Sequence, residues 1–444
     1  MSLKKFMQKH SLAEGQLVKV SGSGVEFSGN ILPGSTKNAQ ILRLKLKSGY
    51  NIGVKLSPKM KVEKLGGEKK VGKGRKMPIE QDESLPKISI LHTGGTIASR
   101  VDYRTGAVFT TFEPEDFLSM FPELLKIGNF SSRLLANMWS DDLRFKHFEV
   151  IANAVKKEYE NGAAGIIVGM GTDNIAVATA AMAFVLEECP IPVIFVGAQR
   201  SSDRPSTDGA MNLICAANFI TKTDFAGVGL CMHNSSSDDK CAIFPPCKTK
   251  KLHSSRRDAF RAVNDTPIAL VDYATGHVEF LKNDYARKSN DKNAKISLRP
   301  RFEEKIAILK AHINMFPGQI EFYRKQKFRG LVIEGTGLGQ MPGHNPGGHT
   351  KIHEEFFPAL SKLIKGGCVI VMTSNTIYGR VHMHVYDKAT DLVNLGVIPG
   401  EDMLTDTAFV KLAWLLGNYR PEQAKEMVGK NLRGEISGFT KYVG

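Results

Sequence analysis

Three polar clusters along the 444-residue chain contain side chains that could do chemistry. Thr93-Gly-Gly-Thr-Ile-Ala-Ser99 and Gly169-Met-Gly-Thr-Asp-Asn174 each follow a short apolar run, and Lys248-Thr-Lys-Lys-Leu-His-Ser-Ser255 is the third cluster. In a parallel sheet, ligands bind just beyond the carboxyl ends of the strands. We therefore expect all three clusters to lie at that edge of a sheet.

The residue types in these clusters suit the activation of an alcohol. Read singly, the first cluster is a tight turn, Thr172 and Asp173 cap a helix, and a lysine is a solvated charge. Together, a buried lysine beside a threonine hydroxyl and an aspartate can take the proton of the alcohol near neutral pH. No Gly-x-Ser-x-Gly motif or Cys–His pairing offers a competing nucleophile, and the sequence has no Gly-x-x-x-x-Gly-Lys-Ser/Thr phosphate loop.

The segments that must position these clusters indicate a parallel α/β fold. A helix is predicted over Arg144–Glu160, where apolar residues recur every three or four positions. Short, continuously apolar and β-branched runs alternate with helical stretches, as in buried parallel strands. These runs are Lys87–Leu91, Gly165–Gly169, Val193–Gly197, Gly227–Leu230, Ile306–Leu309, Leu331–Glu334 and Cys368–Met372. The polar stretch Asn283–Lys295 divides them into an α/β domain at 87–290 and a smaller one at 296–444.

The N-terminal part of the chain has a different pattern. Residues 1–65 contain short runs with period two, such as Leu42-Arg-Leu-Lys-Leu-Lys47, which predict four antiparallel strands in a small β-barrel-like module. The basic residues of that run would form one solvated face. Residues 66–86 are charged, glycine-rich and aperiodic, and predict a linker. Residues 1–80 have a net charge of +12 out of +15 for the chain, so the basicity is local.

Composition excludes several classes of protein. With 42% apolar and 24% charged residues, bulk disorder is excluded, and no run approaches the about 18 apolar residues of a membrane span. Met1–His10 is basic but lacks the apolar core of a signal peptide. Six cysteines suit a reducing cytoplasm. From the few cysteines we expect a cytoplasmic protein. The spacing of Cys231, His233, Cys241 and Cys247 fits no standard zinc motif, so we also expect no metal site.

The chemical clusters resemble those of the L-asparaginase/glutaminase superfamily. The matching motifs, in order within residues 87–430, are Thr93-Gly-Gly-Thr96-Ile, Gly171-Thr172-Asp173, Gly197-Ala-Gln-Arg-Ser-Ser-Asp-Arg-Pro-Ser-Thr-Asp208 and Lys251-Leu-His-Ser-Ser. Four further features resemble one branch, the D-type subunits of archaeal glutamyl-tRNA(Gln) amidotransferases. They are the basic β module, Val101-Asp-Tyr-Arg-Thr-Gly-Ala-Val108, Ile333-Glu-Gly-Thr-Gly-Leu-Gly339, and Val397-Ile-Pro-Gly-Glu-Asp-Met403 leading to Val410-Lys-Leu412.

The resemblance implies a two-domain asparaginase-like α/β body and a set of site residues. Thr96 and Thr172 would be the two catalytic threonines, with Asp173 and Lys251 as the activating pair. Tyr103, on the loop after the first threonine, is the candidate for the family's tyrosine. Ser140-Asp-Asp142 matches the substrate loop, so that Ser140 and Asp141 would hold the α-amino and α-carboxylate groups of the substrate. The backbone N–H groups at Gly95 and Gly171 are candidates to bind the oxyanion.

The branch also implies a reaction and its partners. The chain would be a glutamine amidohydrolase with a threonine nucleophile, supplying ammonia within a glutamine-dependent carbon–nitrogen ligase. A kinase/transamidase partner subunit (the E-type component) would bind ATP and Mg and convert Glu-tRNA(Gln) to Gln-tRNA(Gln). The chain would need no cofactor of its own, and would form a homodimer within a heterotetramer that holds the tRNA.

Two departures from the family pattern bear on function. The usual His-Gly-Thr-Asp-Thr reads Met170-Gly-Thr-Asp-Asn174, which keeps the catalytic Thr-Asp and changes the hydrogen bonding around it. Leu338 stands near a position where free asparaginases often place an asparagine, which favours the amidotransferase branch. The alternatives are a stand-alone cytoplasmic L-asparaginase/glutaminase, and a catalytically inactive nucleic-acid-binding protein suggested only by the basic module.

Overall fold

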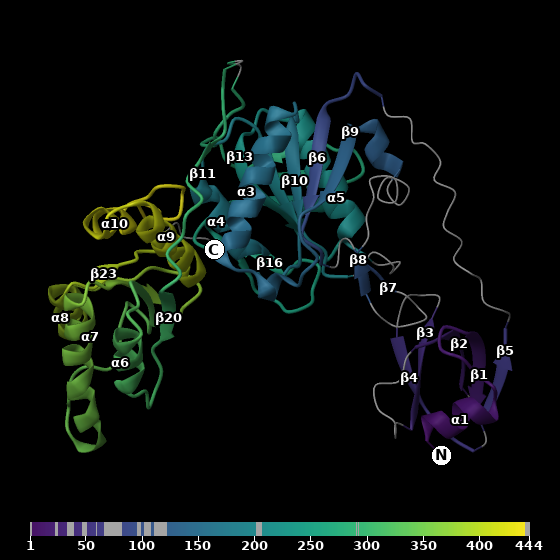
Figure 1. Cartoon of the computed structure of the whole chain (residues 1–444), viewed down its shortest axis with the longest axis horizontal. Helices are drawn as coiled ribbons and strands as arrows, with labels where there is room; N and C mark the ends of the chain where they lie inside the picture. Colours follow the sequence, from purple (N-terminus) through teal and green to yellow (C-terminus); the bar gives the residue numbers. More distant parts are fainter. Residues whose placement is uncertain are drawn as a thin grey trace.

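A computed structural model of the chain describes residues 2–22, 25–32, 40–46, 51–58, 60–65, 82–95, 99–101, 108–110, 122–200, 207–289, 291 and 293–439 (Figure 1). Its largest sheet is built from eight strands in the order β18-β17-β14-β13-β12-β10-β6-β9. The parallel strands are β6 (Lys87–His92), β9 (Asn129–Leu134), β10 (Gly165–Gly169), β12 (Pro192–Val196) and β13 (Gly227–His233). The antiparallel strands are β14 (Lys240–Phe244), β17 (Ala269–Asp272) and β18 (Val278–Phe280).

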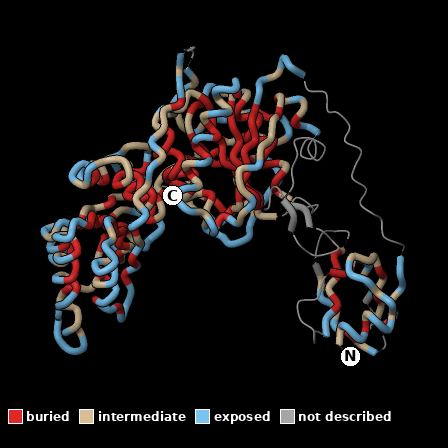
Figure 2. The backbone as a smooth tube through the Cα atoms, viewed as in Figure 1, coloured by how far each residue is buried: buried red, intermediate tan, exposed pale blue. Residues whose placement is uncertain are grey.

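Helices cover both faces of this sheet, as the continuously apolar strands require. On one face, α3 (Phe145–Glu160) and α4 (Ile175–Val185) pack over side chains such as Leu91 and Val168. On the other, α5 (Gly209–Lys222) packs over Ile90 and Ile167. Figure 2 shows buried backbone concentrated along these strands. The carboxyl ends of β6 and β10 therefore emerge from a rigid, doubly covered layer.

A second, smaller sheet follows in the C-terminal part of the chain. It contains four parallel strands in chain order, β20 (Ile306–Lys310), β21 (Gly330–Gly335), β22 (Val369–Ser374) and β23 (Ile398–Pro399). Its helices are α6 (Gly318–Lys325), α7 (Phe356–Lys365), α8 (Asp387–Leu395), α9 (Thr405–Asn418) and α10 (Pro421–Val428). Helix α9 packs against α4, and the rings of Phe184 and Trp414 stack with centroids 5.5 Å apart. The two α/β domains thus share one apolar core.

The N-terminal part forms a separate antiparallel sheet in the order β4-β3-β2-β1-β5. Its elements are α1 (Leu3–Lys9), β1 (Leu17–Gly22), β2 (Val25–Ile31), β3 (Ile41–Leu46), β4 (Asn51–Lys55) and β5 (Lys61–Lys64), one strand more than the alternation predicts. A small core forms around Phe6, Val18 and Leu44. The predicted α/β body preceded by a small antiparallel β module is confirmed.

One prediction for this module is wrong. The alternation in β3 placed Arg43, Lys45 and Lys47 on a solvated face, but Lys45 is only 5% exposed. Its strand, β3, lies between β2 and β4, with Lys45 opposite Asn30 in one and Asn51 in the other, so it is not in an edge strand open to water. Lys47 lies outside the described residues, as does most of the predicted linker. Period two identified the strand correctly but did not identify which residues water reaches.

The remaining elements are short. Two-stranded sheets pair β7 (Ser99–Val101) with β8 (Val108–Thr110), β11 (Leu186–Glu188) with β19 (Ser297–Leu298), and β15 (Thr249–Lys251) with β16 (Phe260–Ala262). The 3₁₀ helices are η2 (Pro122–Lys126), η3 (Ser140–Asp142) and η4 (Gly348–Glu355). Within the part of the chain that the structure describes, no helix is long and apolar enough to span a bilayer.

Candidate active site

Lys251 lies at the end of β15 and reaches across to the turn between β10 and α4. Its Nζ donates hydrogen bonds to Thr172 Oγ1 and to Asp173 Oδ1, each at 2.9 Å. The lysine side chain is only 14% exposed, whereas that of Asp173 is 72% exposed. The amine, the hydroxyl and the carboxylate that could activate an alcohol are therefore in direct contact. This is the arrangement that the three residue types predicted.

The route by which Lys251 arrives differs from the prediction. Only the first two polar clusters follow parallel strands, namely β6 and β10. Lys251 instead belongs to the two-stranded sheet of β15 and β16, which is not part of the eight-stranded sheet. The third cluster was therefore placed incorrectly at the end of a parallel strand, because the sequence gives no sign of a hairpin made from strands of three residues each.

Glycines allow the loops after β6 and β10 to approach closely. Gly95 has φ of +84°, a conformation that glycine adopts without strain. A Cβ at Gly95 would lie 2.4 Å from the backbone nitrogen of Gly171. The N–H of Thr93 also donates to the carbonyl of Gly169 at 3.0 Å. Gly95 itself is therefore held against the loop that carries Thr172.

The turn η3 contributes Ser140 and Asp141 to the same region. Asn174 donates its side-chain N–H to the Ser140 carbonyl at 2.9 Å, and its backbone N–H to Ser140 Oγ at 3.3 Å. Ser140 is buried against Gly171, where an added Cβ would lie 3.0 Å from Ser140 Oγ. Asp141 is exposed and lines, together with Asn174, a cavity of about 390 Å³ walled by Phe145, Phe148 and Phe409. Residues 140 and 174 thus form a clamp between two loops of the site.

A third loop, after β12, closes one side of Thr172. A Cβ at Gly197 would lie 2.8 Å from Thr172 Cγ2. The fully buried Asp208 accepts hydrogen bonds from the backbone N–H groups of Gln199 and Arg200, both at 3.0 Å. This buried carboxylate ties down the beginning of the loop. Its role was not predicted, although Asp208 closes the motif quoted from the sequence.

The structure brings together most of the site residues that the sequence singled out. Thr172, Asp173 and Lys251 are in contact, Gly95 and Gly171 touch, and Ser140 packs on Gly171, with Asp141 at the rim. Thr96 and Tyr103 lie outside the described residues. Sequence reasoning recorded Asn174 only as a departure from a motif and missed its clamp on Ser140. Its partner is 34 residues away, and no local signal marks such a pair.

Three of the four residues that a zinc site could have used, Cys231, His233 and Cys241, are bonded to one asparagine. Nδ1 of His233 lies 2.7 Å from Asn212 Oδ1, and the thiols of Cys231 and Cys241 donate to Asn212 O and Oδ1. In the described segments, no group of three or more His, Cys, Asp or Glu side chains could hold a metal ion. The polar chemistry of this part of the sheet is hydrogen bonding.

Comparison with protein families matches three segments of the chain. Residues 12–65 match the GatD N-terminal domain, residues 87–286 match the Asparaginase, N-terminal family, and residues 305–428 match the Glutaminase/Asparaginase C-terminal domain. All the residues of the candidate site described above fall in the second segment, apart from Phe409 in the cavity wall.

Two full-length relatives carry the same name. The chain is 39% identical to the D-type subunit of glutamyl-tRNA(Gln) amidotransferase from Pyrococcus horikoshii, across 100% of this chain and 99% of that protein. It is also 39% identical to the D-type subunit of the amidotransferase from Methanococcus maripaludis, across 95% and 98% of the two chains. Both alignments extend through the small N-terminal sheet as well as the α/β body.

Solved structures resemble the α/β body. The thermostable L-asparaginase from Thermococcus kodakarensis superposes with a TM-score of 0.68 and 25% identity, covering 80% of this chain and 100% of that one. L-asparaginase I from Vibrio cholerae gives a TM-score of 0.66 at 23% identity, which shows a shared fold. The predicted asparaginase-like fold is confirmed.

Proposed function

The chain belongs to the asparaginase/glutaminase family and, within it, to the D-type subunits of glutamyl-tRNA(Gln) amidotransferases, and from this membership we propose that it hydrolyses glutamine to supply ammonia for the conversion of Glu-tRNA(Gln) to Gln-tRNA(Gln). The observation that carries the proposal is the contact of Lys251 with both Thr172 and Asp173. The full-length alignment, N-terminal module included, favours this function over that of a stand-alone asparaginase.

The chemistry begins with attack by a threonine hydroxyl on the side-chain carbonyl carbon of glutamine. Thr96 and Thr172 are the two candidates, and Lys251 in its neutral form accepts the hydroxyl proton. The carbonyl oxygen becomes an oxyanion, which the backbone N–H groups at Gly95 and Gly171 are suited to bind. The proton passes to the leaving nitrogen, ammonia departs, and water then hydrolyses the threonyl ester to release glutamate.

We assign the binding and orientation of glutamine to η3, which Asn174 holds in place by its hydrogen bonds to Ser140. Ser140 and Asp141 hold the α-amino and α-carboxylate groups of glutamine, with the carboxylate of Asp141 suited to the ammonium group. Asp173 keeps the Lys251 amine against the hydroxyl. These roles use only residues of this chain. We assign ATP and Mg to a kinase/transamidase partner subunit, and propose that two copies of this chain and the partner form a heterotetramer.

The proposal is tested by co-expressing the chain with its partner subunit and measuring two reactions. Glutamine-dependent amidation of Glu-tRNA(Gln) should be lost in Lys251→Met, while amidation driven by free ammonium should be retained, since the activated glutamyl ester accepts ammonia from any source. Loss of both reactions would show that Lys251 supports assembly instead. Full amide hydrolysis by the isolated chain, without partner or tRNA, would identify a stand-alone asparaginase/glutaminase.

A further inference from the structure

The strand that carries Lys251 is too small to hold its own position. β15 has three residues and, among the described strands, pairs with β16 alone, outside the eight-stranded sheet. An isolated two-stranded hairpin has marginal stability in water, so such a unit needs contacts from other elements. Phe260 and Val263, on the returning strand and just after it, are fully buried and fix that side. The β15 side must be fixed by its own side chains.

The three lysines of this segment contact different domains. Lys250 and Lys251 are successive residues of β15, so their side chains point in opposite directions, and Lys248 lies just before the strand. Lys251 faces Thr172 in the N-terminal α/β domain. Lys248 and Lys250 face the C-terminal α/β domain, where each meets an aspartate. Three neighbouring lysines therefore connect the catalytic turn to the second domain.

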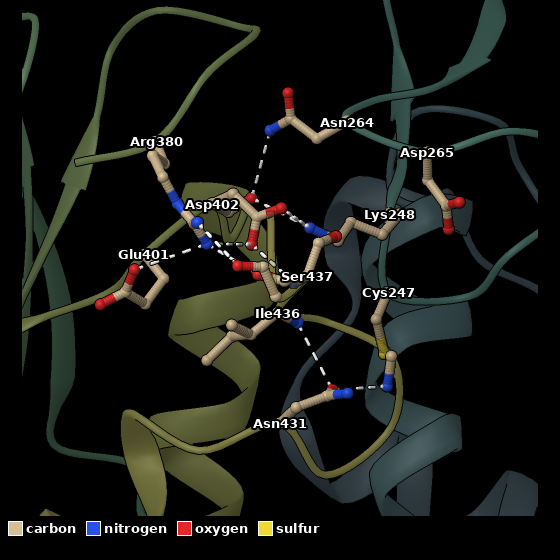
Figure 3. Close-up of polar contacts among 12 residues, drawn as sticks. Cys247, Lys248, Asn264, Asp265, Arg380, Glu401, Asp402, Asn431, Ile436 and Ser437 are labelled. Atoms are coloured by element: carbon tan, nitrogen blue, oxygen red, sulfur yellow. Dashed lines mark hydrogen bonds and ion pairs between the residues drawn. The ribbon is translucent and has the colours of Figure 1, made fainter. Parts of the chain in front are cut away.

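The Lys248 contact is the central one (Figure 3). Lys248 Nζ donates to Asp402 Oδ2 at 2.6 Å, and neither side chain is exposed to solvent. The other carboxylate oxygen of Asp402 accepts the backbone N–H of Ser437 at 2.9 Å, and Arg380 lies 3.9 Å from it. Burial lowers the pKa of Lys248, which the hydrogen bond and charge of Asp402 oppose. A buried pair without one partner is costly, so this contact has one favoured geometry.

Two more contacts fix the same segment to the second domain. Lys250 Nζ lies 2.8 Å from Asp406 Oδ2, and the hydroxyl of Thr407 donates to the carbonyl of Cys247 at 2.9 Å. Both partners belong to the first turn of α9. The segment that ends in Lys251 is therefore attached at 247, 248 and 250 to the C-terminal domain.

The end of the hairpin is attached to the same domain. The side chain of Asn264 donates to the carbonyl of Gly379 and accepts the N–H of Gly379, both at 2.9 Å. Figure 3 shows Asn264 also directed at the Asp402 backbone, where its Nδ2 lies 3.4 Å from the carbonyl oxygen. Glu401, next to Asp402, has φ of +55°, a conformation that a glutamate adopts when its surroundings impose it.

We propose that Lys248 is a positioning residue for the hydrolysis of glutamine: by pairing with Asp402, it makes the C-terminal domain set the place of Lys251 against Thr172. This inference rests on the proposed function of the site. Lys248 does not touch the reacting atoms and acts through Lys251 alone. The C-terminal domain then contributes to activation of the threonine, although the β15–β16 hairpin that carries Lys251 belongs to the N-terminal α/β domain.

The test uses the full chain co-purified with its partner subunit. It compares the replacement of two lysines, Lys248 and Lys411, each of which forms a buried ion pair. Lys411–Glu435 is also a fully buried ion pair at 2.6 Å, but it joins α9 to the C-terminal segment. Lys248→Met should lower kcat for glutamine by about 10- to 100-fold with little change in KM, since misplacement of a catalytic group by about 1 Å costs this much. Lys411→Met should lower the unfolding temperature. Below that temperature, its kcat should not show the loss expected for Lys248→Met.

A second pair provides the test if Lys248→Met does not fold. Lys250→Met removes the half-exposed contact with Asp406, and its control is Lys240→Met, which removes the comparably exposed Lys240–Glu279 pair on β14 and β18. We expect a lower kcat only for Lys250→Met. In a Lys251→Met background, neither Lys248→Met nor Lys250→Met should lower the residual rate further, because there is no amine left to position.

The opposite results would overturn either the role of Lys248 or the proposed function. Folded Lys248→Met and Lys250→Met complexes with kcat within about twofold of the wild type would overturn the inference and leave the proposed function intact. A further loss in the Lys251→Met background would show a general structural role, which overturns it as well. Absence of glutamine hydrolysis by the wild-type complex would contradict the proposed function, and the inference with it.

Discussion

Gly95 packs directly on Gly171, so closely that a single added Cβ would come within 2.4 Å of the Gly171 nitrogen and 2.8 Å of its Cα. The two glycines belong to loops at the ends of neighbouring parallel strands. The two loops meet here through backbone atoms, so the position of Thr172 depends on this backbone contact.

Gly95→Ala should remove this contact and reduce glutamine hydrolysis by about 100-fold or more, since catalytic groups displaced by about 1 Å lose this much. Gly162→Ala is the matched control, because Gly162 has φ of +85°, nearly the same as Gly95, with nothing within 4 Å of the added Cβ. It should cost about 1 kcal/mol of stability from the backbone alone and retain activity. Steady-state kinetics and thermal unfolding of both variants check this, and equal losses of activity would contradict it.

Thr96→Val and Thr172→Val should each reduce glutamine hydrolysis by about three orders of magnitude or more, since valine keeps the shape and removes the hydroxyl. Residues that act as one catalytic unit are not additive, so the double variant should be scarcely slower than either single one. The measurement is ammonia release by the complex, with circular dichroism to confirm folding. A single variant with near-normal activity would remove that threonine from the mechanism.

Asn174→Ala should act on substrate binding more than on catalysis. It removes the side-chain hydrogen bond that holds Ser140 in place, worth about 1 kcal/mol, so KM for glutamine should rise about fivefold while kcat changes less. Asn161→Ala, at the opposite end of α3 from Asp141, is the control and should change neither constant. A fall in kcat at constant KM would place Asn174 with the activating residues instead.

Two thiols, that of the half-buried Cys189 and that of the buried Cys368, make the folded chain sensitive to alkaline pH. Burial raises the pKa of Cys189 and of Cys368 from 9.0 to about 12. Between these values the unfolded chain releases the protons and the folded chain retains them, so the free energy of unfolding falls as pH rises above 9. Cys368→Ala should lessen this fall, measured by guanidinium unfolding at pH 8 and pH 10.

The same pKa shift gives a direct chemical check. At pH 8.5 both thiols remain protonated in the folded chain, and the thiolate is the reactive form. Iodoacetamide should leave Cys189 and Cys368 unmodified in native protein and alkylate both in denaturant, as read by mass spectrometry. Alkylation at equal rates in both states would show that these thiols are not held in the folded structure.

The basic N-terminal module should contribute to tRNA binding by the assembled complex. Lys4, Lys5 and Lys9 on α1 are exposed, and replacing all three by Glu should weaken tRNA binding. The slope of log affinity against log salt should become shallower by about 0.9 for each lost phosphate contact. Replacing the exposed Lys351, Lys362 and Lys365 of the C-terminal domain by Glu makes the same charge change and is the control. An unchanged slope would assign tRNA binding to the partner.

The sequence predicted secondary structure well where both faces of an element are buried. Residues such as Ile166, Ile167 and Val168 are covered on both faces, so their apolar run identifies a central parallel strand directly. The helix predicted from Arg144 begins one residue later, at Phe145. The family resemblance also selected Thr172, Asp173 and Lys251, which the fold brings into contact across 79 residues.

The sequence was less informative where a position depends on several neighbours. Lys45 has the spacing of a solvated residue and is buried, in a strand that has a neighbour on each side. The short strands β15 and β16 carry too few residues to show a period. Lys248 has the type and context of a surface charge, and its buried partner Asp402 lies 154 residues later. Such pairs follow from the packing of two domains, which no local pattern encodes.

The contact of Ser437 with Asp402 also has a consequence for how the enzyme is made. The ribosome completes the hairpin with Lys251 long before it reaches Asp402, and the N–H that secures the Asp402 carboxylate comes only at residue 437. During synthesis the N-terminal domain can fold while Lys248 has no partner. Under the proposed role of Lys248, Lys251 takes its final position only after Asp402 and Ser437 have been synthesised, so we expect glutamine hydrolysis to begin only near the end of translation.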